Sequence, residues 1–154
     1  MTQTPNLVAE RRAQIVAHAN AIGIDESFLS ILVDDFYARV RLDPTLGPIF
    51  NNKIGDNWDH HLEKIKLFWS SVALNSGKYS GTPVPKHIAL KQAPHHVEEQ
   101  HFTVWLSLFR KTLVDNTTCE EAVEYMMERA ERIGASLQLA MFGLPELKAR
   151  PASR

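Results

Sequence analysis

The stretch NWDHHLEKIKLFW, residues 57–69, gathers two tryptophans, two histidines and several charged side chains. In an α-helix, residues three, four or seven positions apart lie on one face. One such face carries Trp58, His61, Ile65, Phe68, Trp69 and, one turn further on, Val72. His60 lies about 100° away from it, on the side of Lys64 and Leu67. The pattern predicts a helix from Trp58 to Leu74 that points one histidine inward among the aromatic side chains.

Helical spacing continues on both sides of this stretch. Apolar positions at three- and four-residue steps predict helices over 8–22 and, capped by Asp25, over 26–40. The segment 43–57 is rich in Pro, Gly and Asn, and predicts an irregular connection. Two further helices are expected, one over 95–114 and one from a capping box at Thr118 and Glu121 to Met141. No period-two pattern with hairpin turns occurs, so the sequence predicts an all-α fold.

Length and composition indicate a single domain over residues 1–154, with a mobile N-terminal end and a mobile tail from about residue 144. The net charge of −1 gives no reason to expect nucleic acid or an anionic membrane as a partner. No apolar run approaches the roughly 20 residues of a membrane span, and the polar start MTQTPN lacks the apolar stretch that a secretory signal has. The single cysteine, Cys119, fits a reducing compartment. We therefore expect a cytoplasmic monomer.

The segment TPVPKHIAL, residues 82–90, can open a short helix at its second proline and carry His87. A helix that short is marginal in water without a tertiary tether. Elsewhere, Tyr37, His61 and Trp105 each place one hydrogen-bond donor on an interior helix face, and buried donors need acceptors. Each residue alone is an ordinary core residue. Together with His87 they favour a flat ligand with an axial metal, bound between the histidine and the three donors.

Four segments resemble, in order and spacing, the bacterial truncated haemoglobins of group III. They are FYARVRLDPTLGPIFNN at 36–52, WDHHLEKIKLFW at 58–69, YSGTPVPKHIAL at 79–90 and HFTVWLSLF at 101–109. The resemblance extends from about Phe36 to Met141. It implies a truncated globin fold, in which two helices stack crosswise on two others around a haem. Because the chain has no CxxCH motif, we expect haem b held without a covalent link.

The resemblance also implies the residues on the two faces of the haem. His87 becomes the proximal ligand of the iron, and Ile88 packs near the ring. Tyr37, Trp105 and His61 become the distal groups that meet a ligand or control its access. The remaining implied haem contacts are Phe36, Phe50, Lys64, Ile65 and Trp69, with Lys64 beside a propionate.

His95 and His96 stay open as proximal ligands in place of His87. The stretch between His87 and Trp105 is a few residues longer than the family pattern leads us to expect, and it contains both of these histidines.

Two distal donors would slow the release of dioxygen, by roughly tenfold for each hydrogen bond. Slow release is awkward for a carrier and favours ligand chemistry, such as detoxification of nitric oxide or peroxide. Nitric oxide dioxygenase or peroxidase-like activity is therefore an open expectation, with an unidentified reductase as partner. Carbon monoxide and cyanide are further expected ligands.

Two other classes of protein stay open. One is a zinc or other non-haem metal protein that uses His60, His61, His95 and His96, although neither HExxH nor CxxC occurs. The other is a cofactor-free helical interaction module, in which Tyr37, His61 and Trp105 are core residues only.

Overall fold

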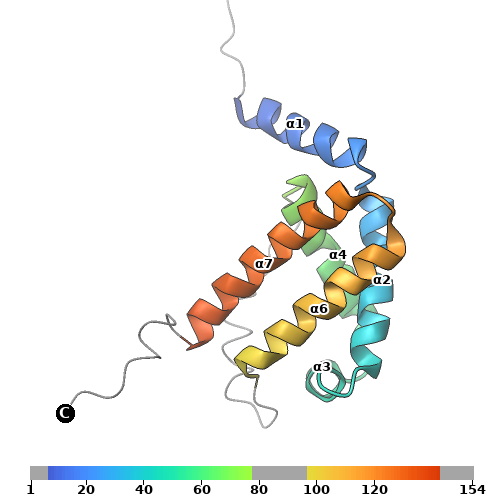
Figure 1. Cartoon of the computed structure of the whole chain (residues 1–154), viewed down its shortest axis with the longest axis vertical. Helices are drawn as coiled ribbons and strands as arrows, with labels where there is room; N and C mark the ends of the chain where they lie inside the picture. The colour runs from blue at the N-terminus through green and yellow to red at the C-terminus, as the bar shows by residue number, and fades with distance from the viewer. Residues whose placement is uncertain (1–6, 78–96, 143–154) are drawn as a thin grey trace, which may run out of the picture.

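The computed structural model describes residues 7–77 and 97–142. Those two ranges contain six helices and no strand, which confirms the all-α class (Figure 1). His87, Ile88, His95 and His96 lie outside the described residues, as do both chain ends, so the predictions made for them stay predictions. No single helix in the described ranges is long and apolar enough to cross a bilayer; α1 and α2 pass that test only as a pair, bent by 64°.

The first two helices agree with the sequence pattern. Helix α1 spans Leu7–Ala21 and α2 spans Glu26–Leu42. The carboxylate of Asp25 accepts a hydrogen bond from the backbone N–H of Phe28 at 2.8 Å, which is the predicted cap. Only the C-terminal part of α1 packs on the rest of the protein, because Ala19 is its one buried residue and Val8 is 68% exposed.

The predicted irregular connection over 43–57 is wrong in its middle, where α3 spans Gly47–Ile54. The carboxylate of Asp43 accepts hydrogen bonds from two backbone N–H groups, those of Thr45 at 2.8 Å and Leu46 at 2.9 Å, and so turns the chain. A Cβ atom on Gly47 would lie 2.8 Å from the carbonyl oxygen of Arg41. Only glycine allows this approach, which folds α3 back against the end of α2.

The remaining helices are α4 over Trp58–Leu74, α6 over Glu99–Asn116 and α7 over Glu120–Phe142. Helix α4 has the predicted bounds, whereas α6 begins four residues later than expected. The predicted cap of α7 is wrong. Because the helix begins at Glu120, Cys119 precedes it, and the hydroxyl of Thr117 accepts a hydrogen bond from the Cys119 N–H at 3.2 Å.

Four helices form two layers, α2 with α4 and α6 with α7 (Figure 1). Contacts of α2 with α6 and of α4 with α7 join the layers. Arg39 of α2 binds Asp35 on its own helix at 3.0 Å and Asp115 of α6 at 2.8 Å. On the other side, the hydroxyl of Tyr125 on α7 donates to the carbonyl oxygen of Ala73 on α4 at 2.7 Å. These polar contacts fix the layers around the aromatic core.

A candidate ligand cavity between the helix layers

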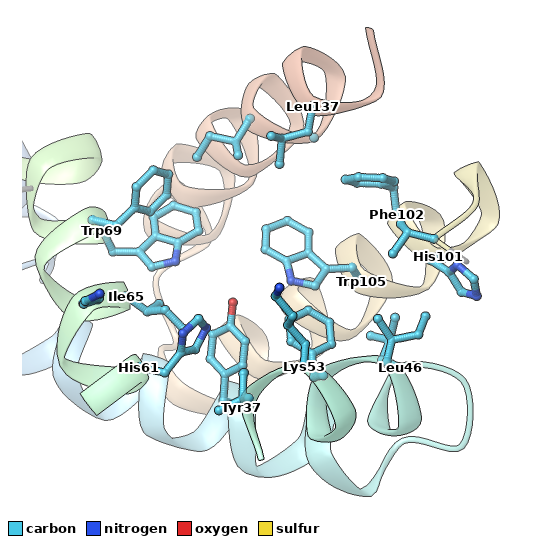
Figure 2. A pocket seen from close by; sticks show the side chains of 18 of the residues that line it. Tyr37, Leu46, Lys53, His61, Ile65, Trp69, His101, Phe102, Trp105 and Leu137 are labelled. Carbon is cyan, nitrogen blue, oxygen red and sulfur yellow. The ribbon is translucent and has the colours of Figure 1, made fainter. Parts of the chain in front are cut away.

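A cavity of about 430 Å³ opens between the two helix layers (Figure 2). Ligand pockets in proteins measure roughly 300–1,000 Å³, so the space suits a bound molecule. The residues that line it are Tyr37, Leu46, Ile49, Phe50, Lys53, Ile54, Asn57, His61, Lys64, Ile65, Phe68, Trp69, Val97, His101, Phe102, Trp105, Ile133, Gly134 and Leu137.

The charges on the cavity wall all have one sign. Lys53 and Lys64 line the cavity, as do His61 and His101, whereas no lining residue in the described ranges is an aspartate or a glutamate. The whole chain carries 18 acidic residues against 17 lysines and arginines, so the wall departs from the average composition. Apolar walls with cations and no carboxylate suit an apolar ligand that carries anionic groups.

Tyr37 and Trp105 meet at this wall. The Tyr37 side chain points from α2 toward the indole of Trp105 on α6 (Figure 2), and the indole N–H donates a hydrogen bond to the tyrosine oxygen. Burial raises the pKa of Tyr37 to about 12, despite the opposing effect of that hydrogen bond. The hydroxyl therefore stays protonated, and its own O–H can donate to a ligand in the cavity.

An aromatic cluster holds these two donors in place. Phe36 packs edge-on against Tyr37 at 4.9 Å, Trp105 at 5.6 Å and Phe109 at 5.0 Å, between ring centroids. Phe109 in turn stacks on both Trp105 and Trp69, at 5.5 and 5.0 Å. Phe36 is fully buried and does not line the cavity. It packs behind the two donors and orients them, and its expected contact with the haem stays a prediction.

Helix α4 forms a second wall, as its sequence pattern predicted. His61, Lys64, Ile65 and Trp69 all line the cavity, whereas His60 is exposed and does not. The His61 ring packs edge-on against Trp58, with centroids 6.0 Å apart. Phe50 of α3 completes this side, with its ring centroid 5.9 Å from that of Tyr37.

The sequence pattern did not identify all of the wall. It gave no role to Lys53 and His101, or to the lining residues of α7. Lys53 was missed because its segment read as an irregular connection. His101 lies in the first turn of α6, where its Nδ1 accepts a hydrogen bond from the Glu98 N–H at 2.8 Å. His101 is the first residue of the segment HFTVWLSLF, but the residue pattern did not predict where its side chain points.

The described residues offer no alternative metal centre. Within 7–77 and 97–142, no three side chains of the His, Cys, Asp and Glu types come together in a way that could hold an ion. The zinc hypothesis thus finds no ligand set there, and His95 and His96 lie outside those ranges. By contrast, the size of the cavity, its apolar walls and the lack of carboxylates among its described lining residues fit a haem with its two propionates.

Comparison with known proteins gives one consistent result. No protein-family model matches the chain. A group 3 truncated hemoglobin of Campylobacter jejuni is 35% identical over 122 residues, which cover 77% of this chain and 92% of that protein. The crystal structure of a group III truncated hemoglobin from Campylobacter jejuni superimposes with a TM-score of 0.70, at the same identity and coverage. The similarity extends over most of the chain in both sequence and structure, and the chain belongs to the group III truncated haemoglobins.

Proposed function

We propose that this globin holds haem b without a covalent link, binds dioxygen and other small diatomic ligands reversibly, and uses them to detoxify nitric oxide or peroxide. The observation that carries the proposal is the Tyr37–Trp105 pair on the wall of an apolar cavity whose lining, among the described residues, contains no carboxylate. When bound, the haem supplies an iron atom that takes small ligands and changes oxidation state. A separate reductase would supply the electrons.

Tyr37 acts as the donor to the ligand. The Trp105 N–H already occupies one lone pair of the tyrosine oxygen, which polarises the hydroxyl and leaves its proton for another acceptor. Because the pKa of Tyr37 is raised to about 12, that proton stays on the oxygen at physiological pH. The tyrosine can therefore stabilise partial negative charge on a ligand without ionising.

This geometry favours reaction over transport. A donor bond in a dry cavity contributes about 1 kcal/mol or more, which slows ligand release by roughly tenfold. Dioxygen held in this way stays available until a second reactant arrives. His61, which also lines the cavity, would control access to it or assist proton transfer. Carbon monoxide and cyanide would bind in the same space.

Other residues of this chain would hold the cofactor. Lys53 and Lys64 carry the charge that propionates need, and both line the cavity. Phe50, Ile65 and Trp69 present apolar surface for the ring. His87, outside the described residues, is the proximal ligand in this proposal, with Ile88 beside the ring. Its neutral imidazole would donate its second N–H to an acceptor that fixes the ring orientation.

The test is a haem titration followed by rapid mixing with nitric oxide. Full-length apoprotein should take up one haem and give an intense Soret band, and the oxygenated protein should convert nitric oxide to nitrate as its iron becomes ferric. His87→Ala should lose most haem, with partial rescue by free imidazole. If no Soret band develops, the haem proposal is refuted. Normal binding without reaction with nitric oxide or peroxide would refute only the detoxification role.

If His87→Ala keeps a normal spectrum while His95→Ala or His96→Ala loses it, the proximal assignment is wrong. Those two variants are matched controls, because each removes an imidazole from the same segment of the chain.

A further inference from the structure

Helix α7 contributes an apolar face to the cavity, and that face has a gap. Ile133, Gly134 and Leu137 line the cavity, so a position without a side chain lies between two bulky ones. Gly134 is buried in the interior of the helix, which continues to Phe142. Glycine is among the least favourable residues in a helix interior, and alanine is the most favourable. A local reason should therefore exist for glycine at this position.

Packing against α6 does not supply that reason. A Cβ atom built on Gly134 would lie 3.8 Å from the Leu106 side chain and 4.0 Å from that of Phe102, both on α6. Within α7, it would lie 4.0 Å from the Gln138 amide nitrogen. These are ordinary van der Waals distances. Gly47 shows the opposite case, because a Cβ there would strike a backbone oxygen at 2.8 Å.

We propose that Gly134 keeps the α7 wall open so that the cofactor ring packs directly against the helix backbone, and that a side chain at this position excludes the ring. The inference rests on the proposed haem function and assigns the α7 side of that site. It makes Gly134 a positioning residue. Its role concerns the shape of the cavity and involves no chemistry on the ligand.

If Gly134 only shapes the cavity, replacing it with alanine should stabilise the apoprotein; if the fold itself needs the glycine, the same change should destabilise it. Gly134→Ala should raise the melting temperature of the full-length apoprotein by about 2–4 °C, because it improves helix propensity and its methyl group fits at ordinary van der Waals distances. Because Gly134 lines the cavity, a ring packed against α7 there should be crowded by the same methyl group, and haem should dissociate several-fold faster. Gly134→Leu adds more volume to the cavity and should speed haem loss by roughly a hundredfold.

The experiment measures thermal unfolding of each apoprotein by circular dichroism, and haem transfer from each holoprotein to an excess of a scavenging apoglobin. Ala135→Leu is the matched control: it adds the same side chain to the exposed neighbouring position and should change neither quantity appreciably. If Gly134→Leu does not fold, Gly134→Ala decides the question, because its methyl group has no close contact.

Any of three results would overturn the inference. Haem transfer from both Gly134 variants at the wild-type rate would show that the ring does not approach α7 at this point. A lower apoprotein melting temperature for Gly134→Ala would show that the fold itself needs the glycine. Wild-type protein that takes up no haem would refute the proposed function and this inference together, whereas wild-type binding with equal binding by the variants would refute the inference alone.

Discussion

Replacing Tyr37 with phenylalanine removes one oxygen atom from the cavity wall and leaves the ring. Tyr37 is 7% exposed, and its ring packs against Phe36 and Phe50, so the aromatic contacts and the packed volume should survive the change. Two polar consequences follow. The ligand loses the tyrosine O–H donor, and the indole N–H of Trp105 loses the oxygen to which it donates.

The size of the effect follows from these two changes. A lost hydrogen bond costs about 0.5–1.5 kcal/mol net, up to roughly tenfold in a dissociation rate. In Tyr37→Phe the released indole N–H can turn to the ligand, so we expect dioxygen to leave only about fivefold faster. Trp105→Phe keeps the tyrosine donor and should accelerate release by about threefold. The double variant lacks both of these donors, and its effect should reach roughly a hundredfold, well above the product of the single effects.

The assay is stopped-flow displacement of dioxygen from the ferrous protein. Carbon monoxide dissociation is the control, because carbon monoxide carries less negative charge on its outer atom and should respond less to the loss of a donor. Unchanged oxygen release in Tyr37→Phe would refute the donor role. Equal acceleration of both ligands would indicate a steric cause, and single effects that simply multiply would contradict the coupling of the two side chains.

Three further predictions concern ionisable groups. The pKa of Tyr37 is about 12 in the folded protein against an ordinary value of 10.0, so the unfolding free energy should fall as pH rises from 10 to 12, by about 2 kcal/mol more than in Tyr37→Phe. Urea melts across this range test it, and parallel curves would contradict it. Burial alone would raise the pKa of Asp35, but hydrogen bonds from Arg39 and Asn116 and the charge of Arg39 lower it. The Asp35 carboxylate therefore stabilises the fold above its ordinary pKa of 3.8, and this stabilisation is lost as pH falls. Asp35→Asn should cost about 1–2 kcal/mol at pH 7 and weaken the loss of stability at acid pH, measured by chemical denaturation; an unchanged loss at acid pH would count against this. Replacing both Lys53 and Lys64 with glutamine should speed haem transfer several-fold and reduce its dependence on salt concentration, and a salt dependence equal to that of the wild type would exclude them as propionate partners.

The sequence predicted the α4 wall well because that wall obeys a single local rule. Residues at three- and four-residue spacing on one helix share a face, so His61, Ile65 and Trp69 had to point together once Trp58–Leu74 was helical. The outward direction of His60 followed from the same geometry. The Asp25 cap was also local, and the structure shows the hydrogen bond that it forms.

The sequence could not predict contacts that depend on how helices cross. Phe36 shares its helix with Tyr37, yet it is fully buried and contacts the rings of Tyr37, Trp105 and Phe109, a packing that helical periodicity alone does not encode. Lys53 reaches the cavity only because Gly47 folds α3 back against α2, an approach between two backbone segments that helical periodicity does not encode. The α7 wall depends in the same way on how α7 lies across the cavity.

The hydrogen bond from Tyr37 to a ligand is tested most directly by the infrared C–O stretch of the carbon monoxide complex, because this frequency responds to positive charge near the outer ligand atom. The ferrous wild-type protein should show a lowered C–O frequency that shifts slightly in D₂O, since the donor proton exchanges. Tyr37→Phe should raise the frequency toward that of a donor-free apolar cavity or show a second band from the released Trp105 N–H. The same frequency in both proteins, without any D₂O effect, would contradict the assignment of Tyr37 as the ligand's hydrogen-bond donor.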